Sequence, residues 1–225
     1  TGNLNTLKIE PEKKGLSVRD ELLKFHSKYY SANLMTLCLL GKENLDELQQ
    51  YAVEIFSDIP NKELPLNDFD PNPYGKNFRP TIKYVAPVKD IKSLSITWTI
   101  PDYRDKYESN PTSYLSHLIG HEGNGSLLSE LKKKGWVNHL YAGSRREARG
   151  FQFFNLILEL SEEGDDNIDN IVKLVYQYLN MIKSEAPSKW IYDEMNNLGK
   201  INFTFKDKEK PISFVSSLSA DLHIF

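Results

Sequence analysis

Residues 93–100 alternate strictly between polar and apolar side chains, and no other pattern in the sequence restricts the fold as much. Leu94, Ile96, Trp98 and Ile100 occupy one parity, and serine or threonine occupies the other. A period of two places the apolar side chains on one face of a β-strand. We therefore expect a sheet that is packed on one face only.

The remaining elements follow from shorter patterns. Apolar stripes of helical spacing predict helices at residues 18–30, 45–56 and 166–183, another one after Pro187, and a capped one from about 127 to 134. Strands are predicted at residues 151–160, 137–144, 33–40 and 82–88. Strands and helices that do not alternate along the chain indicate an α+β fold, with helices on one face of a mostly antiparallel sheet.

Length and proline content suggest more than one unit. The chain has 225 residues, whereas a typical domain has about 150. Five prolines lie between residues 60 and 80, where periodicity is lost, so we expect a linker at 63–80. The chain also begins with Thr1 rather than Met, which we interpret as the start of a fragment.

Composition excludes several classes of protein. A net charge of −3 is small and of the wrong sign for binding nucleic acid. The longest apolar run, at residues 37–40, is far too short to cross a membrane. One cysteine, Cys38, allows neither an internal disulfide nor a cysteine-based zinc site. A reducing compartment, the cytosol, is the expected location.

The segment from His117 to Ser126 is the densest in potential chemistry, and the residues alone leave four interpretations open. His117 and His121 have the i, i+4 spacing of a metal-binding pair, but the glycine after Ile119 should end a helix before His121. Ser126 lacks the pattern of a nucleophile elbow. The glycines also do not match a dinucleotide or P-loop fingerprint.

The fourth interpretation is structural, with Ser126 or Asn124 capping a helix that Gly135 ends. It leaves Glu122 unexplained. A carboxylate in this place could pair with a cation such as the free amino terminus of a peptide. The strand-like residues 137–144 carry small side chains at their end and could offer a free edge to an incoming strand.

Several motifs resemble the pitrilysin family of zinc metallopeptidases. They are the stretch from Leu22 to Met35, the string His-Leu-Ile-Gly-His-Glu-Gly-Asn-Gly-Ser at residues 117–126 with its continuation to 132, Gly-Trp-Val-Asn at 135–138, Ala-Arg-Gly-Phe-Gln-Phe-Phe at 148–154 and Phe-Lys-Asp-Lys-Glu-Lys-Pro at 205–211. The resemblance covers the chain from about Ser17 onward. It implies the pitrilysin-like α+β layers of the LuxS/metallohydrolase type.

The family's zinc motif, His-x-x-Glu-His, is absent from this chain. The resemblance therefore implies that zinc belongs to the full-length enzyme, and that this fragment contains no catalytic or metal-binding residue and is inactive alone. It also implies that residues 1–62 end the first, catalytic domain. Residues 81–225 then form most of a second domain that binds no zinc.

In the family, the second domain carries an exosite that anchors the amino terminus of a substrate by strand addition. The resemblance assigns this role to His117, Gly120, Glu122, Leu140, Ala142 and Ser144. The family has a glycine where Ala142 lies and a glutamine where Ser144 lies. These two departures preserve backbone pairing but alter the side-chain contacts.

The resemblance implies an endopeptidase that degrades insulin-like and other short or amyloid-prone peptides. Its expected partners are peptide substrates, the remainder of the same polypeptide and a second copy in a homodimer, with neither nucleic acid nor membrane. The alternative is a scaffold or peptide-binding module of the same fold that has lost the zinc motif, as in the core subunits related to processing peptidases.

Overall fold

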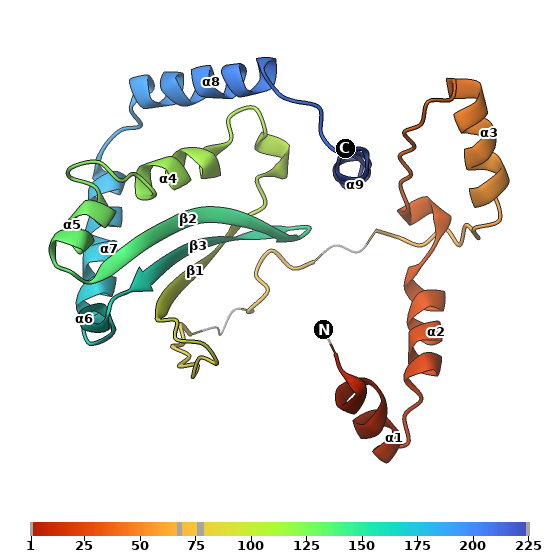
Figure 1. Cartoon of the computed structure of the whole chain (residues 1–225), viewed down its shortest axis with the longest axis horizontal. Coiled ribbons are helices and arrows are strands. Elements are labelled where there is room, and N and C mark those ends of the chain that lie inside the picture. Colours follow the sequence, from red (N-terminus) through yellow and green to blue (C-terminus); the bar gives the residue numbers. More distant parts are fainter. Residues whose placement is uncertain (1, 67–68, 76–78, 224–225) are drawn as a thin grey trace. The chain divides into compact units, whose positions relative to one another are not determined.

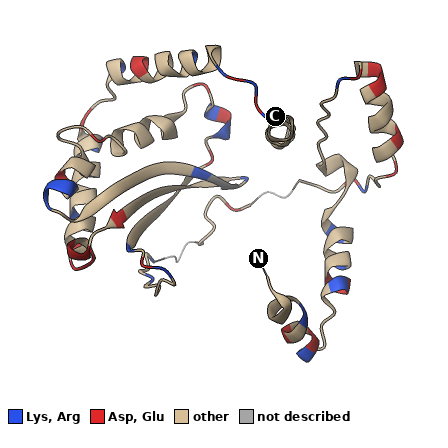
Figure 2. Ribbon diagram, in the orientation of Figure 1, with Lys and Arg blue, Asp and Glu red and all other residues tan. Residues whose placement is uncertain are grey.

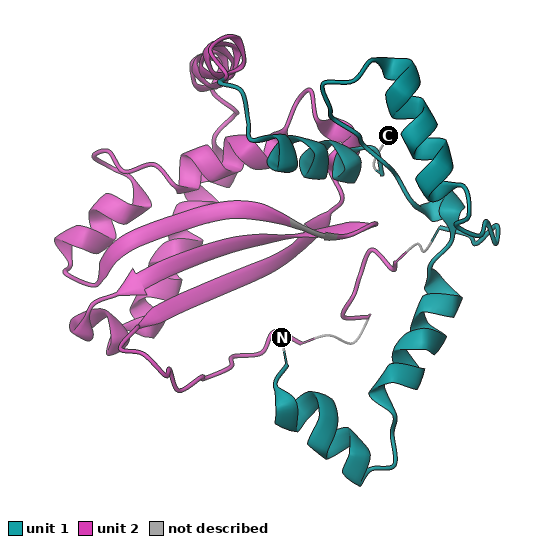
Figure 3. Cartoon of the chain, turned by 45° about the vertical axis from the view of Figure 1, so that its right-hand side comes forward, with its two compact units in different colours: residues 1–66, 207–225 teal, residues 67–206 magenta. Residues whose placement is uncertain are grey.

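The computed structural model describes residues 2–66, 69–75 and 79–223, with the backbone alone for 146 and 147. The chain divides into two units (Figure 3). Unit 1 comprises residues 1–66 and 207–225, and unit 2 comprises residues 67–206. The assignment of residues 1–62 and 81–225 to two family domains stays a prediction.

Unit 2 is built on a three-stranded antiparallel sheet (Figure 1). Its strands are β1 (Ser93–Pro101), β2 (Val137–Ala148) and β3 (Phe151–Leu160), and β3 lies between the other two. In the register, Trp98 pairs with Phe154 and Ala142 pairs with Leu156. The strands expected at 93–100, 137–144 and 151–160 are all present, and the second extends further than its pattern indicates.

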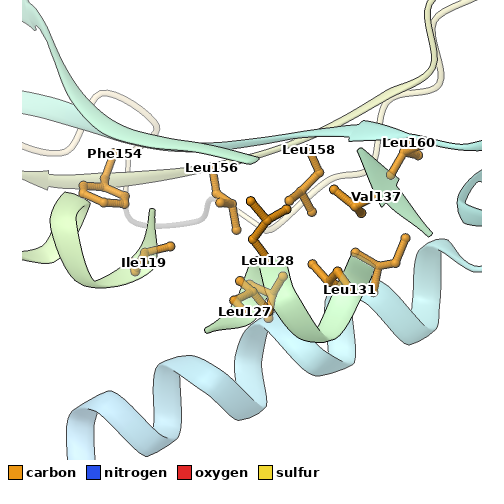
Figure 4. Close-up of a cluster of buried hydrophobic side chains, with 11 residues drawn as sticks. Ile119, Leu127, Leu128, Leu131, Val137, Phe154, Leu156, Leu158 and Leu160 are labelled. Atoms are coloured by element: carbon orange, nitrogen blue, oxygen red, sulfur yellow. The ribbon is translucent and has the colours of Figure 1, made fainter. Parts of the chain in front are cut away.

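Helices cover one face of this sheet, as expected for an α+β fold. The core lies between the sheet and α4 (Pro111–Ile119), α5 (Leu127–Lys133) and α7 (Ile168–Ser184). Figure 4 shows leucines of β3 pointing toward leucines of α5, and Leu131, Leu156 and Leu158 are fully buried. The strict alternation in the sequence thus corresponds to one packed face.

Short-range signals in the sequence fix where α5 begins and ends. The hydroxyl oxygen of Ser126 accepts a hydrogen bond from the backbone N–H of Ser129, with 3.1 Å between the two atoms, so Ser126 caps the helix as predicted. Gly135 follows the helix in the left-handed conformation, with φ = 72°. The helix is therefore short, and three of its residues, Leu127, Leu128 and Leu131, are buried.

The other elements of unit 2 are η3 (Arg104–Lys106), α6 (Glu162–Asp165) and α8 (Lys189–Thr204). The helices predicted at 166–183 and after Pro187 correspond to α7 and α8. Residues 206–210 form a loop, also as expected.

Unit 1 is helical in the residues described. Its elements are η1 (Asn5–Ile9), α1 (Glu10–Lys13), α2 (Val18–Tyr29), η2 (Ala32–Leu34), α3 (Leu45–Phe56) and α9 (Pro211–Asp221). Ser17 caps α2, and Asn44 with Glu47 forms a reciprocal capping box on α3. The sequence predicts α2 and α3 but contains no clear stripe for α9.

Two predicted strands are wrong. Residues 33–34 belong to the 3₁₀ turn η2, and residues 35–40 and 82–88 carry neither helix nor strand, so neither stretch forms a ladder with any strand in the described part of the chain. An apolar run becomes a strand only where a second strand accepts its hydrogen bonds. Without that partner their apolar side chains stay exposed, 43% for Leu37 and 82% for Val85.

The proline-rich stretch behaves as its composition indicates. The described residues between Phe56 and Ser93 contain neither helix nor strand. No helix in the described ranges has both the length and the apolar character needed to traverse a lipid bilayer.

Candidate functional site

The outer edge of β2 is the starting point of the candidate site. β2 pairs with β3 on one side and has no strand on its other side in the described part of the chain. The outer edge of β2 therefore presents backbone N–H and C=O groups without a strand partner, as expected from the small residues at its end. Such an edge accepts a further strand through main-chain hydrogen bonds.

Leu140, Ala142 and Ser144 lie along one face of this edge strand. The register places them opposite Leu158, Leu156 and Phe154 of β3. Leu140 and Ala142 pack partly buried against the core, whereas the Ser144 side chain is exposed. The three predicted residues therefore follow the helix-covered side of the edge, with the hydroxyl of Ser144 in water.

The other predicted residues lie at the end of α4, which packs against β2 (Figure 1). His117 is half-buried in the last turn. Ile119 belongs to the same core as Leu140 and Ala142, which fixes this end of α4 over the strand. The structure thus brings His117 and Gly120 to the side of the sheet that carries the predicted strand residues.

Gly120 is required by a close backbone contact. Its N–H donates to the carbonyl oxygen of Ser116 at 2.8 Å and closes the helix. A Cβ at this position would lie 2.8 Å from the same oxygen, closer than real Cβ atoms come. The glycine therefore has a structural reason in addition to any contact with a ligand.

Glu122 is an acceptor in an exposed position just beyond this helix end. Its carboxylate has no hydrogen bond or ion pair with any residue that the structure describes. The C-terminal end of a helix carries partial negative charge, which favours a cation nearby. Carboxylate and helix end together are therefore suited to an ammonium group.

The two histidines lie on different elements. α4 ends at Ile119, so His121 lies outside the helix, as the glycines predict. The two imidazole centroids are 6.2 Å apart, and Nδ1 of His121 accepts the backbone N–H of Gly123 at 3.1 Å. The ranges 2–66, 69–75 and 79–223 contain no group of three His, Cys, Asp or Glu side chains that could hold a metal ion.

Two tyrosine hydroxyls fix α4 in place, and the sequence gives no sign of either contact. Tyr178 of α7 donates to the carbonyl oxygen of Leu118 at 3.1 Å. The hydroxyl of Tyr114 in α4 accepts the backbone N–H of Ser188 at 2.8 Å. Burial raises the pKa of Tyr178 above its usual value, so its hydroxyl stays a donor at neutral pH.

A separate network joins the end of β1 to the turn between β2 and β3. Arg104 pairs with Asp102 and donates to the carbonyl oxygen of Ala148 at 3.0 Å. Asp102 also accepts the backbone N–H of Gly150 at 3.1 Å. The hydrogen bond from Arg104 lowers the pKa of Asp102 to about 2, so the carboxylate stays ionised and holds the far end of β2.

The free edge of β2 and the end of α4 define a candidate peptide-binding site. Comparison with known proteins gives the family of the chain. Residues 17–198 match the family model described as the peptidase M16 inactive domain. The chain belongs to the peptidase M16 family, and the expected resemblance to pitrilysin-type peptidases is confirmed. A solved crystal structure of pitrilysin matches with a TM-score of 0.75 and 26% identity, covering 99% of this chain and 24% of that one.

Individual proteins that the chain matches are more informative than the family model. The chain is 46% identical over all 225 residues to the insulin-degrading enzyme of Homo sapiens, covering 22% of that protein. It is 45% identical over 225 residues to the insulin-degrading enzyme of Drosophila melanogaster, covering 100% of this chain and 23% of that protein. It is 45% identical over 221 residues to the A-factor-processing enzyme of Saccharomyces cerevisiae, covering 97% of this chain and 21% of that protein. The chain therefore spans about a fifth of the length of these relatives.

The zinc that the family implies does not fit the residues present. The sequence lacks His-x-x-Glu-His, and the part of the chain described here offers no three-ligand cluster.

Proposed function

We propose that this chain is a non-catalytic part of a zinc-dependent endopeptidase, and that it anchors the amino-terminal end of peptide substrates. The anchor is the outer edge of β2 together with the end of α4. The substrates are short or unfolded peptides, including insulin-like and amyloid-prone ones, and the protein acts in the cytosol with the remainder of its polypeptide.

One observation carries this proposal: β2 is an edge strand that lies beside a helix end with an exposed, unpaired acid among the described residues. Backbone pairing recognises an extended peptide without reading its sequence. A site of this kind therefore suits an enzyme that accepts many peptides.

The amino terminus is the chemical group that fits the end of α4. A free ammonium would meet the carboxylate of Glu122, the negative end of the helix and the imidazole of His117. A hydrogen bond to a charged group contributes about 1.5–3 kcal/mol when it is shielded from water, and less at an exposed site. Charge alone thus supplies a modest part of the affinity, and strand pairing supplies the rest.

The experiment compares one labelled peptide with a free amino terminus and the same peptide acetylated. Both are titrated against the complete protein that contains this chain, with its zinc removed so that no cleavage occurs. Glu122→Gln, which keeps the shape and removes the charge, should weaken binding of the free peptide by about two- to five-fold, as for an exposed ion pair. It should leave the acetylated peptide unchanged.

Glu108→Gln is the matched control, because Glu108 is also an exposed acid and precedes α4 rather than following it. Equal losses for both peptides in Glu122→Gln would refute capture of the amine. If the complete protein shows no hydrolysis that a chelator abolishes, the parent is instead a scaffold or binding module of this fold.

A further inference from the structure

We infer that Tyr141 is a specificity-determining residue of this site, and that its ring receives a β-branched or aromatic side chain from the one position of the bound peptide that lies opposite it. The inference rests on the proposed function, since it assumes a peptide strand along β2. It adds a preference for certain peptide side chains to a site whose backbone hydrogen bonds do not distinguish one side chain from another.

Tyr141 lies on the face of the sheet opposite α4. Successive side chains of a strand point to opposite faces. Because Leu140 and Ala142 pack against the core, Tyr141 projects from the other side, where 68% of its surface is exposed. It pairs across the ladder with Ile157 of β3, which is 41% exposed.

The ring is held close to the edge strand by a glycine two residues on. A Cβ at Gly143 would lie 3.6 Å from Cε1 and from the hydroxyl oxygen of Tyr141. The ring therefore lies over the Gly143 backbone rather than extending into solvent. Most of its surface stays exposed on this edge strand, where an added strand can reach it.

The partner of the ring across the ladder is uncharged, and the charges of this face lie to either side of it. Residues 137–144 of β2, 151–158 of β3 and 93–100 of β1 contain no Lys, Arg, Asp or Glu, and these parts of the strands are tan in Figure 2. Arg145 and Glu159 are the next charged residues on the same face of the ladder. A side chain directly opposite Tyr141 would meet the ring and Ile157, which favours an apolar group there.

Strand addition ties the preference to one position of the peptide. Alternate side chains of the added strand fall on the face of α4, and the others fall on the face of Tyr141, where one of them lies opposite the ring. Aromatic residues pair favourably with β-branched and aromatic neighbours across a ladder, and such a pair changes affinity by about two- to five-fold. The peptide should therefore prefer a β-branched or aromatic residue at the position opposite Tyr141.

The test uses labelled peptides of glycine and serine with a free amino terminus and one valine, which is moved from position 2 to position 7. Binding is measured to the complete, zinc-free protein. We expect one position at which valine tightens binding by about two- to five-fold through Tyr141. Tyr141→Ala should abolish the tightening, while Tyr141→Phe should preserve it because the ring remains.

Tyr84→Ala is the control, since Tyr84 is 85% exposed and precedes β1 at the opposite edge of the sheet. The Tyr141→Ala variant must retain the difference between free and acetylated peptides, which shows that the protein is folded and the anchor intact. The inference alone is overturned if the difference between free and acetylated peptides persists but valine tightens binding at no position of the peptide, or if the gain from valine is unchanged in Tyr141→Ala. Loss of the free-versus-acetylated difference in the parent protein refutes the proposed function itself.

Discussion

The hydroxyl of Tyr178 in α7 donates a hydrogen bond to the carbonyl oxygen of Leu118, at an oxygen–oxygen distance of 3.1 Å. Leu118 follows His117 directly and precedes Gly120 by two residues, in the last turn of α4. The last four carbonyls of a helix lack intrahelical partners. One residue of the covering helix therefore stabilises the turn that carries the candidate site.

Tyr178→Phe removes this donor and leaves the Leu118 carbonyl without its side-chain partner. Loss of one partner from a buried hydrogen bond destabilises a protein by about 1–3 kcal/mol. We expect faster hydrogen exchange in α4 and weaker binding of peptides with a free amino terminus. Tyr176→Phe, on the same helix but 47% exposed, should change neither. Unchanged exchange in Tyr178→Phe would contradict this role.

Two glycine-to-alanine substitutions should have opposite effects. Gly120→Ala places a Cβ 2.8 Å from the Ser116 carbonyl oxygen, so the end of α4 must shift. Gly199 lies within α8 with nothing within 4 Å of an added Cβ. Alanine there should stabilise the chain by about 0.5–1 kcal/mol. Urea unfolding of the two variants measures the contrast, and a stabilised Gly120→Ala variant would exclude the close contact.

The Asp102–Arg104 pair predicts a dependence of stability on pH. Asp102 has a pKa of about 2, below the ordinary 3.8, because Arg104 and the Gly150 N–H favour its charged form. A lowered folded-state pKa stabilises the fold above about pH 4, and this contribution disappears as the pH falls to about 2. Its size at neutral pH is about 2 kcal/mol.

Asp102→Asn should therefore be less stable than the parent at pH 7 and close to it near pH 2. Unfolding free energies of both proteins across this range give the comparison. Asp105→Asn serves as the control, because that carboxylate is 67% exposed beside Lys106. A stability difference that does not change with pH would show that the charge of Asp102 is irrelevant.

Adjacent residues of β3 should differ sharply in their contribution to stability. Leu156 is fully buried, and Leu156→Ala should cost about 2–5 kcal/mol through lost burial and the cavity left behind. Ile157 points to the helix-free face, so Ile157→Ala should cost less than about 1 kcal/mol. Equal losses on denaturation would mean that the two faces of the sheet are not distinguished as described.

The 225-residue chain with added zinc should not hydrolyse a quenched fluorescent peptide. The reason is the missing His-x-x-Glu-His motif rather than a folding defect. Turnover that a chelator abolishes would overturn this prediction. Purified full-length protein, assayed in parallel, shows that the substrate and buffer support the reaction.

The sequence by itself determined the one-sided sheet and the caps of its helices. The alternation at 93–100 and the serine before α5 are local signals, because strand period and capping depend on residues a few positions apart. The same local logic predicted the end of α4 at its glycine. The resemblance to the family then supplied the candidate residues, at 117–122 and at 140–144.

Only the tertiary structure decided which apolar runs became strands and which side chains met. Residues 33–40 have as much strand character as 151–160, but the first run has no neighbour in the described chain to accept its hydrogen bonds. Tyr178 and Leu118 are 60 positions apart, and Ala142 lies opposite Leu156 only because β2 pairs with β3. Ladder partners and contacts between helices join residues distant in sequence, and no local pattern encodes them.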